Sequence, residues 1–322
     1  MKWLKKIRRG LSLWLRHAKR LSSSRLGWIP IALDMVYCKL HFRITEYEYL
    51  KYNFHNFSNR YRKHFVLLYH KRFQYKKTST KNFTLSKYTF AQRIPDLFVR
   101  PMLLLSNCSR EAFITFLRNQ GKVVIKPDQG SLGANVEIME YTDDASAGVA
   151  YDRFSQGEPM LCEAFIAQHE TLQKLNPYSV NTVRIVTILY EGKAEVVAAI
   201  LRTGAVKDCI VDNLRQGGIG AQVDIPTGII TTFGYDYSSH IYVNHPLSGV
   251  QFIGLQIPHW EQAVKCVLEA HSRLPQCKIY GWDIAFTPDG IDIIEANNSP
   301  GPLIMQIMDC IPKGQHLLKL LK

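Results

Sequence analysis

The sequence predicts an α+β protein built from two regions of different composition. The first 90 residues hold 21 Lys or Arg against three acids, whereas the rest of the chain holds 19 against 24. From Ser109 onward, helix and strand patterns alternate, and near the C-terminus two β-rich runs flank Pro288-Asp289-Gly290. We therefore expect a basic, mainly helical N-terminal region at residues 1–83, followed by an α+β domain at residues 84–322.

The composition favours a folded protein of the reducing cytoplasm. With 322 residues, 46% of them hydrophobic, the chain can bury a large core. The sequence contains no uninterrupted run of 18 apolar residues, so it predicts no transmembrane helix. The seven cysteines are scattered without a CxxC pair, which favours free thiols over a disulfide framework or a zinc site.

Residues 1–21 are predicted to form a basic amphipathic helix. They place apolar residues, including Trp3 and Trp14, at helical spacing, with eight Lys or Arg and no acid. Such a helix suits an anionic membrane interface, and packing of its apolar stripe on the rest of the protein is an equal alternative. It is not a signal peptide, because basic residues interrupt every candidate apolar core.

Residues 41–90 continue the basic, aromatic composition. Aromatic and basic residues together can bind single-stranded nucleic acid, but no nucleic-acid-binding motif accompanies them. Helical packing with a solvated charged face is therefore favoured, and acidic lipid headgroups or an anionic glycan intermediate would suit the same charge.

A lysine at a strand end precedes a glycine-containing loop in the α+β region. Ser109 can cap a helix that reaches Asn119, and a strand at residues 122–126 then runs into the loop of residues 127–135. The ammonium group of Lys126 and the loop amides could hold phosphates. The segment matches neither the P-loop nor GxGxxG, so an ordinary glycine hairpin with a surface lysine is the alternative.

Arg184 lies within an apolar strand predicted at residues 181–189, after a shorter strand at 160–163 and a polar connection at 168–170. A buried arginine is unfavourable unless an anion pairs with it. A phosphate group and a structural carboxylate are both candidate partners.

The C-terminal hairpin sets two carboxylates opposite each other. A three-residue loop, Pro288-Asp289-Gly290, would pair Thr287 with Ile291 and Asp283 with Glu295, with Asn297 on the face of Glu295. Carboxylates about 5 Å apart repel by roughly 3 kcal/mol at an effective dielectric near 20. A hard divalent cation would relieve this repulsion, and the small polar loop that follows favours a ligand site over a plain surface hairpin.

Several sequence segments follow one another in a fixed order: IKPDQGSLG, CEAFIAQH, NPYSVNTVRIVT, VDNLRQGGIG, HPLSG, GWDIAFTPDG and IIEANNSPG. In combination and in this order they resemble the ATP-grasp superfamily over residues 84–303. The similarity is greatest to the sugar-transfer associated ATP-grasp branch and more distant to D-alanine–D-alanine ligase. The resemblance implies two subdomains with mainly antiparallel sheets that clasp Mg-ATP, plus the helical N-terminal extension.

The resemblance also implies roles for individual residues. The residues that would contact the ATP phosphates or close over them are Lys87, Lys126, Gly130, Ser131 and Gly133. Those that would line the adenine slot are Glu163, Phe165 and Ile166, with Glu170 at the ribose. Mg²⁺, as two ions, would be bound by Asp283, Glu295 and Asn297. The residues that would face the acceptor or the acyl-phosphate are Arg184, Arg202, Asn213, Gly217, Gly218 and Asn298, with Arg184, Arg202 and Lys126 as the catalytic cations.

Two departures from the family pattern affect the expected reaction. The superfamily often has an arginine two residues before the metal aspartate, where this chain has Gly281. Arg184 or Arg202 could supply that charge. The α/β domain that usually precedes the ATP-grasp module is also not recognisable in residues 1–80.

The resulting functional prediction is an ATP- and Mg²⁺-dependent ligase. A substrate carboxylate would attack the γ-phosphate and an amine would capture the acyl-phosphate, in the biosynthesis of a polysaccharide or glycan precursor. A kinase acting on a hydroxyl or phosphate acceptor is the first alternative. A non-catalytic adaptor for anionic membrane or nucleic acid is the second. The expected location is the cytoplasm, with residues 1–21 as a candidate contact to the inner face of the membrane.

Overall fold

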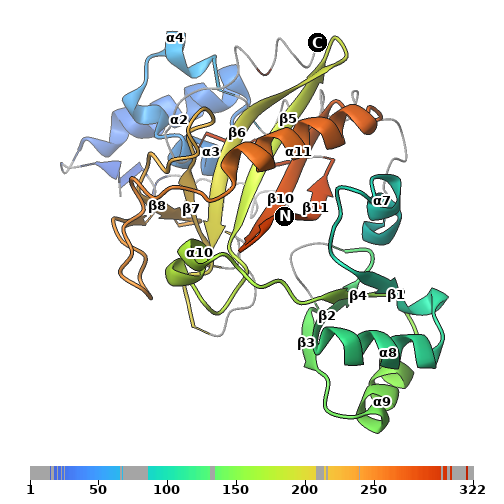
Figure 1. The fold of residues 1–322 in the computed structure, drawn as a ribbon. Helices are drawn as coiled ribbons and strands as arrows, with labels where there is room; N and C mark the ends of the chain where they lie inside the picture. The colour runs from blue at the N-terminus through green and yellow to red at the C-terminus, as the bar shows by residue number, and fades with distance from the viewer. Residues whose placement is uncertain are drawn as a thin grey trace, which may run out of the picture. The chain divides into compact units, whose positions relative to one another are not determined.

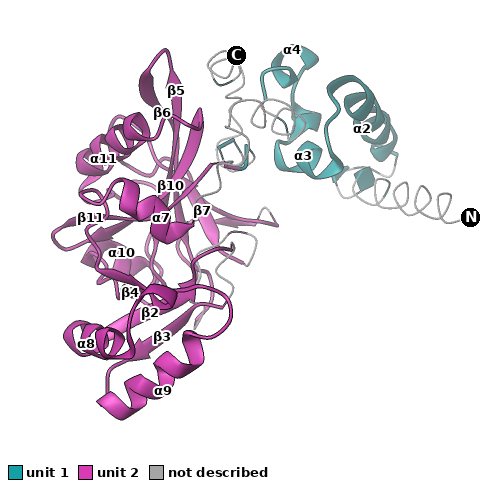
Figure 2. Cartoon of the chain, turned by 90° about the vertical axis from the view of Figure 1, so that its right-hand side faces the viewer, with its two compact units in different colours: residues 1–78, 301–322 teal, residues 79–300 magenta. Residues whose placement is uncertain are grey.

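A computed structural model describes residues 15, 18–19, 21–22, 24, 26–65, 67, 86–130, 135–207, 214, 217–238, 240–298, 300–302, 305–306 and 317. The chain divides into two compact units (Figure 2): an N-terminal unit of residues 1–78 and 301–322, and a main unit of residues 79–300. The sequence predicts the boundary after residue 83, with the C-terminal segment in the main domain. Contacts such as the hydrogen bond from Gln306 Nε2 to Tyr52 Oη, at 3.1 Å, instead join this segment to the N-terminal unit.

The described part of the N-terminal unit is helical, as its composition predicts. Its elements are α2 (Trp28–Phe42), α3 (Glu46–Lys51), the 3₁₀ helix η1 (Phe54–Asn56) and α4 (Asn59–Arg62). A capping box begins α3, where the Thr45 side chain accepts from Glu48 N and the Glu48 carboxylate accepts from Thr45 N. The helix predicted at residues 1–21 lies almost entirely outside the described residues.

The first sheet of the main unit is antiparallel, in the order β1-β4-β2-β3 (Figure 1). Its strands are β1 (Met102–Leu104), β2 (Lys122–Pro127), β3 (Glu137–Glu140) and β4 (Met160–Ala164). The helices α8 (Arg110–Gln120) and α9 (Asp144–Phe154) pack on it through a shared apolar core. The predicted Ser109 cap is present, since its side chain accepts from Ala112 N. The short helix α7 (Lys87–Arg93) precedes β1, and the 3₁₀ helix η3 (Leu105–Asn107) follows it.

The second sheet has seven antiparallel strands in the order β11-β10-β5-β6-β7-β8-β9. They are β5 (Thr182–Tyr190), β6 (Lys193–Thr203), β7 (Ile219–Gln222), β8 (Gly234–Asp236), β9 (Ile241–Tyr242), β10 (Ile279–Thr287) and β11 (Gly290–Asn297). Two helices accompany them, α10 (Glu170–Leu175) and α11 (Trp260–Arg273).

The two faces of the seven-stranded sheet differ in chemistry because side chains alternate along each strand. One face, with Ile185 and Trp282, packs against α11 in the main core. Arg184 and Asp283 are cross-strand partners on the other face. The fold therefore separates an apolar face from a charged face on the same strands.

The β10–β11 hairpin pairs Asp283 with Glu295, as predicted, but through a different turn. Thr287 pairs with Gly290, so Pro288 and Asp289 alone form the turn and the predicted three-residue loop is wrong. The register then shifts by one residue between Ile284 and Asp283, a β-bulge that restores the predicted pairing.

Among the described helices, none has both the length and the apolar composition needed to cross a membrane. The described cysteines at positions 38, 108, 162, 266 and 277 are free thiols.

Candidate nucleotide and metal site

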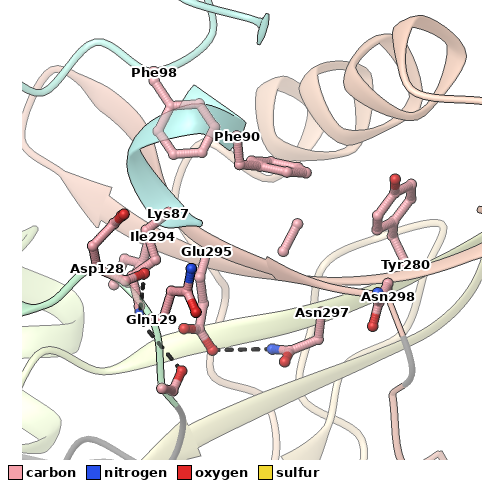
Figure 3. A pocket seen from close by; sticks show the side chains of 12 residues that line it. Lys87, Phe90, Phe98, Asp128, Gln129, Tyr280, Ile294, Glu295, Asn297 and Asn298 are labelled. Carbon is pink, nitrogen blue, oxygen red and sulfur yellow. Dashed lines mark hydrogen bonds between the residues drawn. The ribbon is translucent and has the colours of Figure 1, made fainter. Parts of the chain in front are cut away.

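A cavity of about 230 Å³ lies between α7, the loop after β2 and the end of β11 (Figure 3). Five of the predicted phosphate, metal or substrate residues line it, which brings together sequence segments more than 150 residues apart. The lining residues are Lys87, Phe90, Phe98, Asp128, Gln129, Gly130, Tyr280, Ile294, Glu295, Ala296, Asn297 and Asn298.

Lys87 joins the start of α7 to the glycine loop. Its Nζ donates to the carbonyl oxygens of Pro127 at 3.0 Å and Gly130 at 3.4 Å. Burial, and then the neighbouring charge of Lys126, lowers the pKa of Lys87. Both effects mean that an anion in the cavity would stabilise the ammonium group. The predicted loop residues Ser131 and Gly133 lie outside the described residues.

Lys126 is paired with an acid from the neighbouring strand. Its Nζ lies 2.6 Å from Glu163 Oε2, and both side chains are buried. Glu163 was expected at the adenine slot, and its carboxylate here holds the ammonium group of the predicted phosphate lysine. A phosphate that binds Lys126 would share or replace this pairing.

Arg100 extends this pair to the second sheet. Its Nη2 lies 3.2 Å from Glu163 Oε1, and its Nη1 lies 2.6 Å from Asp292 Oδ2 on β11. Burial opposes ionisation of Glu163, but the charges of Arg100 and Lys126 outweigh it and lower the pKa of this carboxyl. The sequence prediction missed Arg100. Arg100 lies within the apolar run from Leu97 to Leu105, and this position could have identified it. The same argument, an arginine within an apolar segment, identified Arg184.

The predicted adenine and ribose residues Phe165, Ile166 and Glu170 are not among the described residues that line this cavity. Phe165 follows β4, where its backbone N donates to Lys122 O at 3.1 Å and its ring lies 4.6 Å from Lys122 Nζ. Glu170 begins α10 and forms an exposed pair with Lys174 at 3.3 Å. Ile166 lies in the connection between these two residues. An adenine slot at this connection therefore stays a prediction.

Asp283 is neutralised by two arginines on the charged sheet face. Arg184 binds both carboxylate oxygens, with Nη2 at 2.6 Å from Oδ2, and Arg202 Nη1 lies 2.9 Å from Oδ2. Burial disfavours the charged carboxylate, but the two arginines outweigh it and hold the pKa of Asp283 well below its usual range. Of the two partners considered for Arg184, the structure therefore contains the carboxylate.

Gly281 leaves the space that Arg184 needs. A Cβ atom at position 281 would lie 3.0 Å from Arg184 Cδ and 2.9 Å from Pro300 Cβ, both tighter than ordinary contacts. Where the family pattern often has an arginine on this strand, the chain has a glycine, and an arginine from the neighbouring strand β5 passes over it.

Glu295 has no comparable neutralising partner. No described Lys or Arg forms a salt bridge with it, and Asn297 Nδ2 donates to its Oε1 at 3.0 Å (Figure 3). Burial, and then the charge of Asp283, raises the pKa of Glu295. A cation bound here would offset both the unfavourable burial of the Glu295 charge and its repulsion by Asp283.

The donor set fits a hard cation such as Mg²⁺. Glu295 and Asn297 supply oxygen atoms at the cavity wall, and Asp283 lies directly opposite Glu295. The described residues contain no group of three or more His, Cys, Asp or Glu able to hold a metal. The two carboxylates and the amide would therefore need oxygens of the nucleotide to complete the coordination.

The predicted substrate residues are only partly placed. Asn298 lines the cavity, and Gly217 and Gly218 immediately precede β7, with Gly217 at a φ of +94° that favours glycine. Asn213 lies outside the described residues.

Comparisons with known proteins give one family match and several solved structures of low similarity. No curated protein matches the chain. The solved structures similar to it include the ATP-grasp ligase PsnB with a minimal precursor variant, Mg and ADP (16% identity, 74% of this chain, 59% of that chain, TM-score 0.45). Another is the D-cycloserine synthetase DcsG (13% identity, 74% of this chain, 70% of that chain, TM-score 0.44). A third is the D-alanine–D-alanine ligase from Bacillus anthracis (14% identity, 73% of this chain, 62% of that chain, TM-score 0.40).

The family profile for sugar-transfer associated ATP-grasp proteins matches residues 51–320, most of the chain. The two antiparallel sheets expected from the resemblance are both present. The chain therefore belongs to the sugar-transfer associated ATP-grasp family, and its fold is the ATP-grasp fold.

Proposed function

We propose that this protein is an ATP- and Mg²⁺-dependent ligase that joins a carboxylate to an amine. A carboxylate oxygen of the substrate would attack the γ-phosphorus, with ADP as the leaving group. The amine would then attack the acyl carbon and release inorganic phosphate. The observation that carries the proposal is the cavity wall, where Glu295 and Asn297 lie with Lys87 and Gly130 and no described Lys or Arg forms a salt bridge with Glu295.

The cations of the site divide into two groups with different tasks. Lys87 and Lys126 lie on the side of the glycine loop, where they would hold the phosphates of ATP. Arg184 and Arg202 lie on the charged face of the seven-stranded sheet, where they would stabilise the transferring phosphoryl group or the acyl-phosphate. Mg²⁺, when bound by Glu295, Asn297 and Asp283, would supply charge neutralisation at the phosphate oxygens.

Each lysine would have to change partners when the nucleotide binds. Lys87 now donates to three loop carbonyl oxygens, those of Pro127, Asp128 and Gly130. Lys126 is paired with Glu163. Because the pKa of Lys87 is lowered by burial and by Lys126, phosphate oxygens would be favourable new partners. Glu163 would keep Arg100 as its partner when Lys126 turns to a phosphate.

The family name suggests a glycan or a lipid-linked glycan precursor as the substrate, and polysaccharide biosynthesis as the process. We propose two Mg²⁺ ions, a cytoplasmic location and contact of the basic residues 1–21 with the inner face of the membrane. Partition of the chain onto anionic vesicles, with and without residues 1–21, tests the last point.

A product assay tests the ligase reaction. ADP release is measured with panels of carboxylates and amines, and the products are identified by mass spectrometry. We expect ADP release that needs a carboxylate, and an amide product that needs both compounds. A stable phosphorylated product formed without an amine would instead establish a kinase.

Matched variants of one hairpin separate catalysis from a passive binding role. Asp283→Asn and Glu295→Gln change the proposed metal residues, whereas Asp289→Asn changes an exposed acid at the turn of the same hairpin. We expect the first two variants to lose ADP release and the third to retain it. Unchanged function in Asp283→Asn and Glu295→Gln would reject the enzyme and favour an adaptor.

A further inference from the structure

Helix α2 of the N-terminal unit is apolar on two sides. One side enters the core of the unit, where Met35 and Cys38 are buried. The other side carries five exposed apolar residues at spacings of three, four, seven and eight residues, which places them on one helix face. These residues, the α2 outer face, are Ile29, Leu33, Val36, Tyr37 and Leu40.

The exposure of this face is large for aliphatic side chains. Leu33 is 67% exposed and Leu40 is 77% exposed, and Leu26, just before the helix, is 69% exposed. Single exposed apolar residues are common on proteins, but a continuous stripe indicates a surface that binds something. The opposite side of α2 already packs in the core of the N-terminal unit. The α2 outer face is therefore a surface of a folded unit and not part of its core.

The only acid of α2 does not contribute negative charge to this face. Asp34 accepts from both Arg62 Nη1 and Nη2 at 2.7 Å, and from Tyr49 Oη at 2.5 Å. The last turn of the helix carries the basic residues Lys39 and His41. The helix therefore carries a lysine in its last turn, and its only acid is held in an internal ion pair.

The charge of the surrounding chain identifies the kind of partner. The first 90 residues hold 21 Lys or Arg against three acids, including residues 1–21 with eight basic residues and no acid. A second copy of the chain would bring two strongly basic surfaces together, which is unfavourable. Nucleic acid would use the charge but not an aliphatic stripe. An anionic bilayer offers both negative headgroups and an apolar layer.

We propose that the α2 outer face inserts into the interface of an anionic lipid bilayer. Ile29, Leu33, Val36 and Leu40 would enter the boundary between headgroups and acyl chains, while Tyr37 keeps its hydroxyl near the headgroups. This surface is distinct from residues 1–21, and it does not depend on the ligase reaction.

Vesicle partition of the full chain tests the proposal. The probes are phosphatidylcholine vesicles with and without phosphatidylglycerol, and the variant is Leu33→Ser/Leu40→Ser. We expect the wild-type chain to prefer anionic vesicles, and the variant to lose about tenfold or more in partition coefficient, because two leucines no longer enter the bilayer. The matched control, Val149→Ser/Ile241→Ser, removes two similarly exposed aliphatic residues of the main unit, 68% and 60% exposed, and should bind as the wild type does.

Three outcomes would overturn the proposal. The first is unchanged partition of Leu33→Ser/Leu40→Ser, which would leave residues 1–21 as the sole membrane contact. The second is an equal loss in the control variant. The third is a wild-type dimer in light scattering that this variant converts to a monomer without changing vesicle binding, which would assign the face to a second copy. Circular dichroism checks folding, and Leu40→Ser alone serves if the double variant unfolds.

Discussion

The main unit contains two ion clusters of the same composition, each with two cations and two carboxylates. In the cluster of Lys126, Arg100, Glu163 and Asp292, cations and acids alternate, and both acids have a cationic partner. In the hairpin cluster of Arg184, Arg202, Asp283 and Glu295, Asp283 takes both arginines, and no described cation pairs with Glu295.

The comparison shows that a raised pKa alone does not mark a metal ligand. Burial raises the pKa of Asp292 despite the Arg100 charge, and burial with the Asp283 charge raises the pKa of Glu295. Asp292 is buried and bound by Arg100, whereas Glu295 lines the cavity beside Asn297. We infer that the first cluster holds the two sheets together and that the second keeps a carboxylate available for a cation.

The largest expected effect is on activity, from Glu295→Gln. The amide keeps the shape of the side chain but removes the charge that would bind Mg²⁺, so ADP release should fall by about 100-fold or more. The pKa of Glu295 is raised, so its ionised form costs stability at neutral pH and the amide should raise the melting temperature without nucleotide. Asp289→Asn, at the exposed turn, should change neither quantity.

Asp283→Asn should cause the largest loss of stability. It removes the carboxylate that neutralises Arg184 and Arg202, and breaking a buried ion pair on one side costs about 3 kcal/mol. Denaturant unfolding measures this change. A loss as small as that of an exposed pair would show that the two arginines have other adequate partners.

Arg100→Lys should weaken the first cluster by about 2 kcal/mol of unfolding free energy, because an ammonium group cannot span Glu163 and Asp292 with a planar fork. The matched control is Arg118→Lys, since Arg118 binds Asp144 on the surface, where such pairs contribute little to stability. Equal changes in the two variants would contradict a role for Arg100 in joining the sheets.

Gly281→Ala should cost about 1–2 kcal/mol, because its Cβ would crowd both Arg184 and Pro300. ADP release should also fall, since Arg184 is displaced from Asp283. Gly301→Ala is the control, because a Cβ there meets no atom within 4 Å. A Gly281→Ala variant with wild-type stability and turnover would show that the arginine does not need this space.

The smallest expected effect is on the pH dependence of Mg²⁺ binding. Because the pKa of Glu295 is raised, this carboxyl takes up a proton at a higher pH than an ordinary glutamate. The stabilisation by Mg-ATP should therefore weaken as pH falls toward and below the raised pKa, measured as thermal shift. In Glu295→Gln that pH dependence should be reduced, and an unchanged profile would assign it to another group.

The strand patterns predicted the local elements and the pairing of Asp283 with Glu295, because alternation and turn residues act over short distances. The turn itself was predicted one residue too long, and the bulge on β11 compensated for the error. The position of Arg184 in an apolar strand predicted an anionic partner but could not choose between a phosphate and a structural carboxylate, and it did not identify Asp283. Arg100 was missed because its partners lie 63 and 192 residues away along the chain, on two different sheets.

The most direct test of the account is the effect of Mg²⁺ on ATP binding, measured by calorimetry in the wild type and in Glu295→Gln. The account predicts that Mg²⁺ tightens ATP binding about tenfold or more in the wild type. In the variant this gain should disappear, while ATP still binds through Lys87 and Lys126. A full Mg²⁺-dependent gain in Glu295→Gln would contradict the assignment of this carboxylate to the cation.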